Sequence, residues 1–509
     1  MTEAAIVATL SSAFDIAELS SLSGAVKWLE VRADVADDID PSSLRSRFSG
    51  GLIYTLRSSA DSGRFVGSED TRRRRLLDAA KAYDIIDLEA DRDLVPELLS
   101  AIPANQRMIS WNGPAVDCAT LSNRLNALSE IPARFYRVIP RSVKAGDEIA
   151  GLSMLKQVRR SDVVSYTTGQ TGFWSRLVAP QFGCPMVFGT INKHLSDAEE
   201  PTVSQLIEDY NLPSTSPIKE IYGIVGNPIY HSLSPRLHNS AYRTLGYPAL
   251  FVPFNAESFE EFFRDVAVAR TTESLGISIR GFTVASPHKE TALDAAGACS
   301  PMVKRAGSTN IFVRNNGGWR ADTTDPEGVV QSVRQRGIRL DRERVAVVGC
   351  GGSGRAIAAA LNESGADVTL VNRGMERGRQ ALELLSLPFV PLSKFSPRGY
   401  SMIVNATPVG RDGSALPLNY ADLGSVPVVV DLVYGAQTTP LIASAIASGN
   451  VAIDGREVLF VQVRRQFQLM TGRDMPADLA TKLLRPPIGS RPSRKSGATA
   501  EALALGGTA

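Results

Sequence analysis

The stretch GFTVASPHKE, residues 281–290, raises the question of what Lys289 does. It begins with an extended apolar alternation, typical of a half-buried strand, and ends in a Pro-His-Lys cluster. A strand that stops at such polar residues would run out into a cleft. Lys289 is therefore either a surface charge, as most lysines are, or a group that acts on a bound molecule.

Two serines in GNPIYHSLSPRLHN (226–239) follow another apolar, strand-like run. Ser232 and Ser234 are two positions apart, so in an extended segment their hydroxyls would face the same way and could bind a carboxylate. Taken alone, the pair is more typical of a hydroxyl turn or a helix cap.

The strongest motif is Gly349-x-Gly351-x-x-Gly354, within RVAVVGCGGSGRAIAAALNESGADVTLVNR. The pattern predicts a strand, a glycine-rich turn, a helix and a second strand in that order. Such glycines let a pyrophosphate approach the N-terminus of a helix closely. The context therefore predicts a dinucleotide site rather than a merely structural turn.

The end of the second strand indicates which dinucleotide binds. An NAD-preferring site usually has an acidic residue about 20 positions past the glycines, but this chain has Asn372, Arg373 and, further on, Arg377. Guanidinium groups can pair with a 2′-phosphate, and no carboxylate is present to repel it. We expect NADP as the cofactor; the alternative is that these arginines lie on the solvated surface.

The apolar runs predict the elements that must hold these motifs. Residues 1–212 repeat a short β-rich run followed by a helical pattern, which indicates a TIM (β/α)8 barrel with its chemistry at the C-terminal strand ends. The runs are AAIVATL, VKWLEVRA, GLIYTLRS, YDIIDLEA, RMISWNG, RFYRVIP, DVVSYTTG and PMVFGTIN. NLPSTSPIKE (211–220) is typical of a linker, after which strands alternate with helices again and a βαβ unit opens at Arg344. The expected units are a barrel (1–212), an α/β substrate domain (218–330 and 456–480), a Rossmann NADP-binding domain (341–455) and a disordered tail (484–509).

Composition excludes several other classes of protein. The chain has 509 residues, 43% hydrophobic and 21% charged, with no apolar run long enough to span a bilayer. The formal net charge of +2 does not favour nucleic acid, and the basic run from Arg72 to Arg75 is expected on a solvated helix face. The four cysteines are scattered and form no metal-type pair, so we expect reduced thiols and no metal. The N-terminus shows no signal or transit pattern, which makes a cytoplasmic location the default expectation.

Residues 221 to about 480 resemble the shikimate dehydrogenase family, through motifs that occur in the family's order. These motifs are YGIVGNPIYHSLSPRLHN, PHKE, GSTNIFV, DTTDPEG, VVGCGGSGRA, VNR, IVNATPVG, DLVY, TTPL and DGREVLFVQ. The resemblance implies an NADP-dependent oxidoreductase that reversibly reduces 3-dehydroshikimate to shikimate, in the pathway to chorismate and aromatic amino acids. Its partner would be this small-molecule substrate, with no nucleic acid or membrane, and a homo-oligomer stays open.

The resemblance also implies roles for single residues. Lys289 and Asp325 would be the catalytic pair, with Lys289 giving a proton in reduction and taking it back in oxidation. His288 is an alternative acid, but neighbouring strand residues point to opposite sides. The substrate-binding positions would be Ser232, Ser234, Thr283, Asn310, Tyr434 and Gln462. The cofactor side would comprise Gly349, Gly351, Gly352, Gly354, Arg355, Asn372, Arg373, Arg377, Asn405 and Thr407.

The substrate half departs from the family at several positions. Thr283 and Ala285 stand where the family usually has Asn or Ser and Thr, Ile311 replaces a threonine, and Thr323 replaces an asparagine. Ala285 removes a hydroxyl that would face the substrate, and a site that loses a polar partner can change its substrate. Quinate or a similar polyol acid therefore stays open beside shikimate.

The N-terminal unit resembles type I dehydroquinate dehydratase, and such a barrel fused to a shikimate dehydrogenase is a known arrangement. The matching residues of its ligand site are Glu30, Arg32, Arg57 and Arg176, with Asp87, Glu89 and Ser175. That family uses an imine-forming lysine and an acid–base histidine.

The barrel lacks both of these groups at the matching positions. Asn112 occupies the histidine position and Arg137 the lysine position, and neither can do that chemistry near neutral pH. Lys144 is the nearest other lysine, and no histidine occurs in residues 1–193. Two further departures are Asp61 for a glutamate and Glu199-Glu200 for a Gly-Gln pair, while Lys193 and His194 are more typical of a loop.

Three functional hypotheses follow. The first is an NADP-dependent shikimate dehydrogenase with an inactive dehydratase-like barrel. The second is an active bifunctional enzyme, or a quinate/shikimate dehydrogenase. The third is a sensor that binds metabolites without catalysis, which an intact Lys289–Asp325 pair would argue against.

Overall fold

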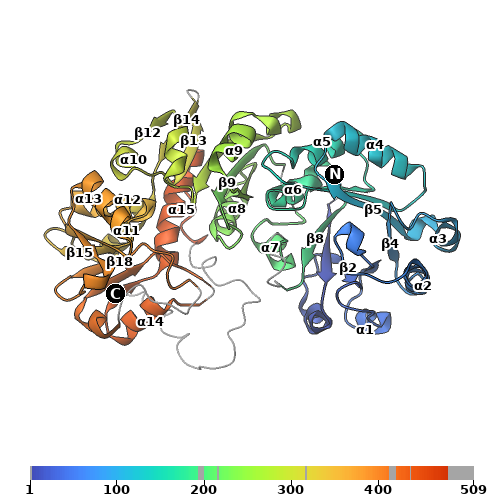
Figure 1. Cartoon of the computed structure of the whole chain (residues 1–509), viewed down its shortest axis with the longest axis horizontal. Coiled ribbons are helices and arrows are strands. Elements are labelled where there is room, and N and C mark those ends of the chain that lie inside the picture. The colour runs from blue at the N-terminus through green and yellow to red at the C-terminus, as the bar shows by residue number, and fades with distance from the viewer. Residues whose placement is uncertain are drawn as a thin grey trace.

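In the computed structural model, the strands form three sheets, which lie one after another along the long axis of the molecule (Figure 1). The residues that it describes are 3–192, 200–214, 217–315, 318–411, 420–435 and 437–479. The tail expected to be disordered lies outside the described residues, as do Lys193, His194 and Glu199.

The first sheet is a nearly closed 8-stranded parallel barrel in the order β7-β6-β5-β4-β3-β2-β1-β8, so the predicted TIM-barrel architecture is confirmed. Each apolar run counted in the sequence overlaps one of its strands, and only β5 and β6 extend beyond their runs, by one residue each. They are β1 (Ala5–Leu10), β2 (Val26–Arg32), β3 (Gly51–Thr55), β4 (Ile85–Glu89), β5 (Arg107–Pro114), β6 (Phe135–Arg141), β7 (Val163–Val164) and β8 (Met186–Thr190). The helices around it are η1 (Ala13–Ser21), α1 (Pro41–Arg45), η2 (Ser59–Asp61), α2 (Glu69–Ala79), α3 (Pro96–Ala101), η3 (Ala104–Gln106), α4 (Cys118–Ser129), α5 (Ile149–Val158), α6 (Phe173–Val178), η4 (Ala179–Phe182) and α7 (Val203–Glu208).

The basic run on α2 differs from the prediction. Arg72 is fully buried, and its guanidinium donates two hydrogen bonds to Asp93 at 2.7 Å and lies 3.4 Å from Glu89. The prediction of a solvated face was wrong for this residue, because a charge run seen in sequence does not reveal the carboxylates that a neighbouring βα loop brings to it.

The second sheet is mixed and 6-stranded, in the order β10-β9-β11-β13-β14-β12. Its strands are β9 (Glu220–Gly226), β10 (Ala249–Asn255), β11 (Ser278–Val284), β12 (Ala298–Cys299), β13 (Ile311–Asn315) and β14 (Gly318–Asp322). Its helices are α8 (Ser234–Thr244), α9 (Phe259–Phe262), η5 (Phe263–Val268), η6 (Thr271–Leu275), η7 (Thr291–Ala295), α10 (Pro301–Ala306) and α11 (Asp325–Gln335). A last helix, α15 (Gly455–Thr471), returns to pack against α11 and α8.

The third sheet is parallel and 6-stranded, in the order β17-β16-β15-β18-β19-β20, which is the Rossmann order. The strands are β15 (Arg344–Val348), β16 (Asp367–Asn372), β17 (Phe389–Pro391), β18 (Met402–Asn405), β19 (Val428–Asp431) and β20 (Val451–Ile453). The helices are α12 (Gly352–Glu363), α13 (Met375–Leu385), η8 (Leu392–Lys394), η9 (Tyr420–Ser425) and α14 (Pro440–Ala447). The central strands are buried, as expected for parallel strands covered on both faces.

The barrel and the second sheet share one hydrophobic core. A continuous cluster of buried side chains runs from the barrel interior to β10 and β11, and Trp174 of α6 packs edge-on against Phe254 of β10 at 5.8 Å between ring centroids. The Rossmann sheet has its own core. Among the described residues, no helix is both long and apolar enough to cross a membrane.

Candidate active site between the second and third sheets

A cavity of about 1010 Å³ lies between the second and third sheets and is lined from both. Its walls include the C-terminal ends of β9, β11, β15 and β16 and the loops after β18 and β19. Open α/β sheets bind ligands at the carboxyl ends of their strands. The location is therefore typical of a ligand site built from both domains.

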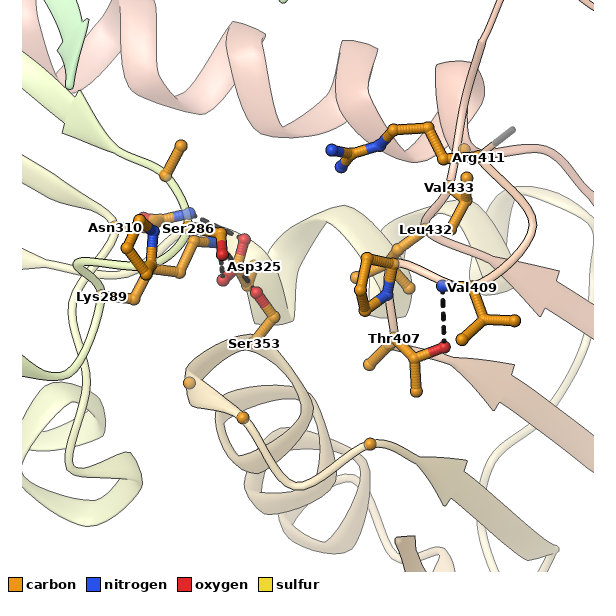
Figure 2. A pocket seen from close by; sticks show the side chains of 18 of the residues that line it. Ser286, Lys289, Asn310, Asp325, Ser353, Thr407, Val409, Arg411, Leu432 and Val433 are labelled. Carbon is orange, nitrogen blue, oxygen red and sulfur yellow. Dashed lines mark hydrogen bonds and ion pairs between the residues drawn. The ribbon is translucent and has the colours of Figure 1, made fainter. Parts of the chain in front are cut away.

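Lys289 points into this cavity from the turn after β11 (Figure 2). Its ammonium donates hydrogen bonds to Asp325 Oδ2 at 2.6 Å and to Ser353 Oγ at 2.8 Å. An ammonium has three N–H donors, so one remains for a substrate oxygen. Lys289 therefore faces the cavity and is not a solvated surface charge.

Asp325, the first residue of α11, is buried, and both of its carboxylate oxygens accept hydrogen bonds. Its Oδ1 accepts hydrogen bonds from Asn310 at 2.8 Å and from Gln462 of α15 at 3.0 Å, while Oδ2 faces Lys289. Asn310 in turn accepts a hydrogen bond from the backbone N–H of Thr324 at 2.8 Å. This network fixes the carboxylate that holds Lys289.

His288 faces away from the cavity, although not for the reason expected. Residues 286–290 form a turn rather than a strand, because β11 ends at Val284. The His288 ring is buried and lies 2.8 Å from the Ala256 carbonyl oxygen through Nε2. The histidine fixes the turn, and the lysine beside it reaches the site.

The two serines occupy the N-terminal end of α8. Ser232 Oγ accepts a hydrogen bond from the backbone N–H of Ser234 at 3.2 Å, so the turn interpretation from sequence describes their local geometry. Ser234 lines the cavity with Thr283 and Tyr434. Burial raises the pKa of Tyr434, against the effect of its hydrogen bond with Ser232, so the phenol stays neutral near pH 7. Hydroxyl groups thus gather at this end of the cavity.

The glycine-rich turn leaves room for a cofactor. Gly349 has a positive φ of 109°, which side chains rarely adopt, and a Cβ on Gly354 would lie 1.8 Å from the Gly349 carbonyl oxygen. Gly351 faces open space, where a pyrophosphate could approach the N-terminal end of α12. This turn therefore fits a bound dinucleotide.

The basic residues of the expected cofactor side separate into two groups. Arg373 and Arg377 are exposed and line the cavity, and Arg377 forms an ion pair with Glu290. Arg355 instead is buried, lies 3.0 Å from Glu290 Oε2, and donates to the Gly307 carbonyl at 3.0 Å. Arg355 therefore joins the two domains and does not line the cavity.

Asn372, Asn405 and Thr407 shape the turns around the cavity. Asn372 accepts a hydrogen bond from the Cys350 N–H at 3.2 Å, and the fully buried Asn405 donates to Asp431 at 2.9 Å. Thr407 donates to Asn405 at 2.7 Å and lines the cavity. Asn405 does not line the cavity itself. It accepts the hydrogen bond that fixes Thr407, which does line the cavity.

Sequence reasoning missed three residues at this site. Ser353 contacts Lys289, Glu290 pairs with Arg377, and Arg411 lines the cavity across from Lys289 (Figure 2). Glu290 follows the lysine directly and Arg411 closely follows the Asn-Ala-Thr-Pro motif. Proximity to those motifs was the available signal.

The barrel mouth holds a second set of buried charges. Glu30 accepts hydrogen bonds from Thr9, Thr55 and Arg137, each at 2.9 Å. Burial alone would raise the pKa of Glu30, but the charges of Arg137 and Arg32 hold it below its usual value. Glu30 and Asp87 likewise hold the pKa of Arg137 above its ordinary range, against the effect of burial. Both groups are therefore ionised.

The remaining barrel residues of the expected ligand site either form ion pairs or bond to the backbone. Arg57 pairs with Asp87 at 2.5 Å and Asp61 at 2.6 Å, and Asn112 donates to Asp61 at 2.9 Å. Arg176 donates to the Phe188 carbonyl at 3.0 Å and lies 3.4 Å from Glu200, while Arg32 pairs with Asp34 at 2.9 Å. Ser175 and Glu89 are buried and bond to backbone groups of Gly172 and Ser58, which are structural contacts.

The fold and the site together define a dinucleotide-dependent oxidoreductase joined to a (β/α)8 barrel. The family model described as Type I 3-dehydroquinase matches residues 6–217, and the one described as shikimate dehydrogenase substrate binding domain matches residues 224–312. A shikimate dehydrogenase (NADP(+)) from Halorubrum lacusprofundi is 34% identical over 281 residues, which cover 52% of this chain and 98% of the relative. The chain therefore belongs to the shikimate dehydrogenase family.

Two further proteins to which the chain is similar are a plant bifunctional enzyme and a bacterial enzyme of known structure. The chloroplastic bifunctional 3-dehydroquinate dehydratase/shikimate dehydrogenase of Arabidopsis thaliana is 24% identical over 490 residues, which cover 90% of this chain and 79% of the relative. The crystal structure of shikimate 5-dehydrogenase from Thermus thermophilus in complex with NADP(H) and shikimate is 31% identical, covers 52% of this chain and 98% of that chain, and has a TM-score of 0.46.

Proposed function

We propose that this chain is an NADP-dependent shikimate dehydrogenase that interconverts shikimate and 3-dehydroshikimate. The observation that carries the proposal is the Lys289–Asp325 pair, 2.6 Å apart in the same cavity as the glycine-rich turn. The hydrogen bond from Lys289 to Ser353 places the ammonium beside that turn. A proton carrier and a dinucleotide site are thus within reach of one bound substrate.

The residues of the cavity support this reaction as follows. The glycine-rich turn would hold NADP, which would supply the hydride acceptor for oxidation and the hydride donor for reduction. Lys289 exchanges the proton of the reacting hydroxyl, and Asp325 fixes its position and stabilises its charge. Ser232 and Ser234 bind the substrate carboxylate, while Asn310 and Gln462 orient both Asp325 and the ring hydroxyls. Arg373 and Arg377 select the 2′-phosphate.

Shikimate is the substrate that this assignment predicts, with quinate as the alternative. Thr283 and Ala285 line the cavity where the family usually has Asn or Ser and Thr. The methyl group of Ala285 offers no hydrogen bond to a ring hydroxyl, which weakens discrimination between polyol acids.

The test is NADPH formation by the purified chain with shikimate, beside quinate, beside NAD in place of NADP, and beside Lys289→Ala. We expect turnover of shikimate with NADP and a loss of about 10²–10⁴-fold in kcat in the variant. Turnover of quinate alone would reassign the substrate. Binding of shikimate without turnover would favour a sensor and contradict the proposed enzyme.

We also propose that the barrel has no dehydratase activity. The groups at the lysine and histidine positions are Arg137, which is paired with Glu30, and Asn112, which is bonded to Asp61. A guanidinium does not form the required imine, and an amide does not transfer protons near pH 7. Lys144 is exposed and lies beyond the end of β6, outside the interior of the barrel.

Two assays separate an inactive barrel from an active one. Incubation with 3-dehydroquinate is expected to give no dehydration, and borohydride reduction in its presence is expected to give no covalent adduct by mass spectrometry. An adduct on any lysine, including Lys193 outside the described residues, would establish the bifunctional alternative. The cytoplasmic location and the oligomeric state stay predictions of the sequence.

A further inference from the structure

The loop that carries the two serines is contacted by the barrel. Tyr230 lies two residues before Ser232, and its hydroxyl donates a hydrogen bond to the Gln170 carbonyl at 2.6 Å. Its ring lies 5.0 Å from the ring of Phe173, which is buried at the start of α6. A barrel loop therefore packs directly on the serine loop.

The helix that follows the loop is held by the last helix of the barrel. Arg236, in the first turn of α8, donates a hydrogen bond to Asp209 at 2.6 Å and lies 3.1 Å from Glu208. Asn239 donates to the Asp209 carbonyl at 2.8 Å. The Arg236 and Asp209 side chains are only 6% and 9% exposed, so the ion pair is shielded from screening by solvent.

These contacts hold the serine segment (227–239) between the cavity on one side and the barrel on the other. On one side, Ser234 faces the cavity, and on the other side Tyr230, Arg236 and Asn239 are bonded to barrel residues. Figure 1 shows α8 beside β9, between the barrel helices α6 and α7 and the rest of the second sheet. The segment's position therefore depends on residues outside its own domain.

We propose that the barrel positions the carboxylate-binding serines, through Gln170, Phe173 and Asp209 acting on Tyr230, Arg236 and Asn239. This inference rests on the proposed function, because it takes Ser232 and Ser234 to bind the substrate carboxylate. The barrel residues are positioning residues, since their contacts are with the serine segment and not with the reacting groups. They keep the serines in place before substrate binds, so binding does not have to order the loop.

A mild pair of substitutions tests this arrangement in the full-length chain. Tyr230→Phe removes only the hydroxyl that bonds to Gln170, and Phe173→Leu removes the ring while keeping an apolar side chain. Each is expected to raise KM for shikimate about three- to tenfold, the effect of one lost hydrogen bond or packed contact. Because Lys289 and the cofactor turn are untouched, kcat and KM for NADP should change less than about twofold.

Lys156→Met is the matched control. Lys156 of α5 donates a hydrogen bond to the Ser274 carbonyl at 2.6 Å, so it also joins the barrel to the second sheet, but on η6 and not on the serine loop. Its KM for shikimate is expected to equal that of the wild type. A rise equal to that in Tyr230→Phe would show a general effect of the interface and overturn the proposal.

Hydrogen–deuterium exchange makes the test independent of activity. Exchange in the segment 227–239 is expected to be faster in Tyr230→Phe and Phe173→Leu than in the wild type and in Lys156→Met. Unchanged exchange with unchanged KM would overturn the positioning role alone. A wild-type chain that does not oxidise shikimate would instead count against the proposed function, and the exchange experiment would still decide whether the barrel holds the loop.

Discussion

At the scale of single residues, Ser353 links the glycine-rich turn to Lys289. Lys289 donates to both Asp325 and Ser353, which directs its third N–H toward the cavity. Ser353→Ala removes one of these acceptors and is expected to lower kcat about fivefold, the effect of about 1 kcal/mol, with KM for shikimate nearly unchanged. Steady-state kinetics measure both values.

The control for Ser353 lies at the other end of the same helix. Ser364 follows α12, and its hydroxyl donates to the Ala360 carbonyl at 2.9 Å. Ser364→Ala should leave kcat unchanged. An equal fall in both variants would indicate a structural effect on α12 rather than an effect on Lys289.

Arg377 carries the second prediction at this scale. Its pairing with Glu290 holds the guanidinium at the cavity edge, where a 2′-phosphate can compete for it. Arg377→Gln is expected to raise KM for NADP about tenfold and to leave KM for NAD unchanged, because NAD has no 2′-phosphate. Arg379→Gln, an exposed change on the same helix, is the control. Equal rises for both dinucleotides would contradict the assignment.

At the scale of elements, the sequence predicted what depends on local patterns. The β-rich runs predicted all eight barrel strands, and the glycine spacing predicted the turn between β15 and α12. Contacts between distant segments were not predictable in this way. Ser353 meets Lys289 across 64 positions and Glu290 meets Arg377 across 87, so no local pattern contains either pair. Arg72 was misplaced for the same reason.

The helices α5 and α6 illustrate how one buried carboxyl connects elements. Glu148, just before α5, accepts hydrogen bonds from Trp174 Nε1 and the Gly146 N–H, each at 2.8 Å. Burial raises the pKa of Glu148 to about 7, although these hydrogen bonds act against the rise. Trp174 packs on Phe254, so the carboxyl supports the contact between barrel and second sheet.

The raised pKa predicts a pH-dependent stability. A carboxyl that titrates at a higher pH when folded than when unfolded contributes stability below pH 4.5, and loses it as pH rises through about 7. The loss amounts to at most about 3 kcal/mol. Glu148→Gln should therefore show a smaller fall in the free energy of unfolding between pH 5 and pH 8 than the wild type, in urea titrations.

The control for Glu148 is a glutamate in solvent. Glu130→Gln changes an exposed glutamate after α4 and should leave the wild-type pH dependence as it is. If Glu148→Gln and the wild type fall in parallel between the two pH values, the carboxyl is not held protonated by its surroundings.

At the scale of the whole molecule, the barrel and the second sheet form one packing unit. Leu29 of β2 and Phe282 of β11 belong to the same continuous cluster of fully buried side chains, although they come from different sheets. Elements that share a core lose their packing together. A substitution that destabilises the barrel should therefore also affect the cavity between the second and third sheets, even though no described residue of the barrel lines that cavity.

Leu29→Ala tests this coupling, because it opens a cavity at a fully buried position of the barrel and should cost about 2–5 kcal/mol. We expect the variant to lose shikimate oxidation at a lower temperature than the wild type, in step with loss of the barrel's circular dichroism signal. Val66→Ala, at a position that is 85% exposed, should lose activity at the wild-type temperature. Oxidation that survives to the wild-type temperature in Leu29→Ala, after its barrel has melted, would show that the two units fold independently and that the shared core transmits no stability between them.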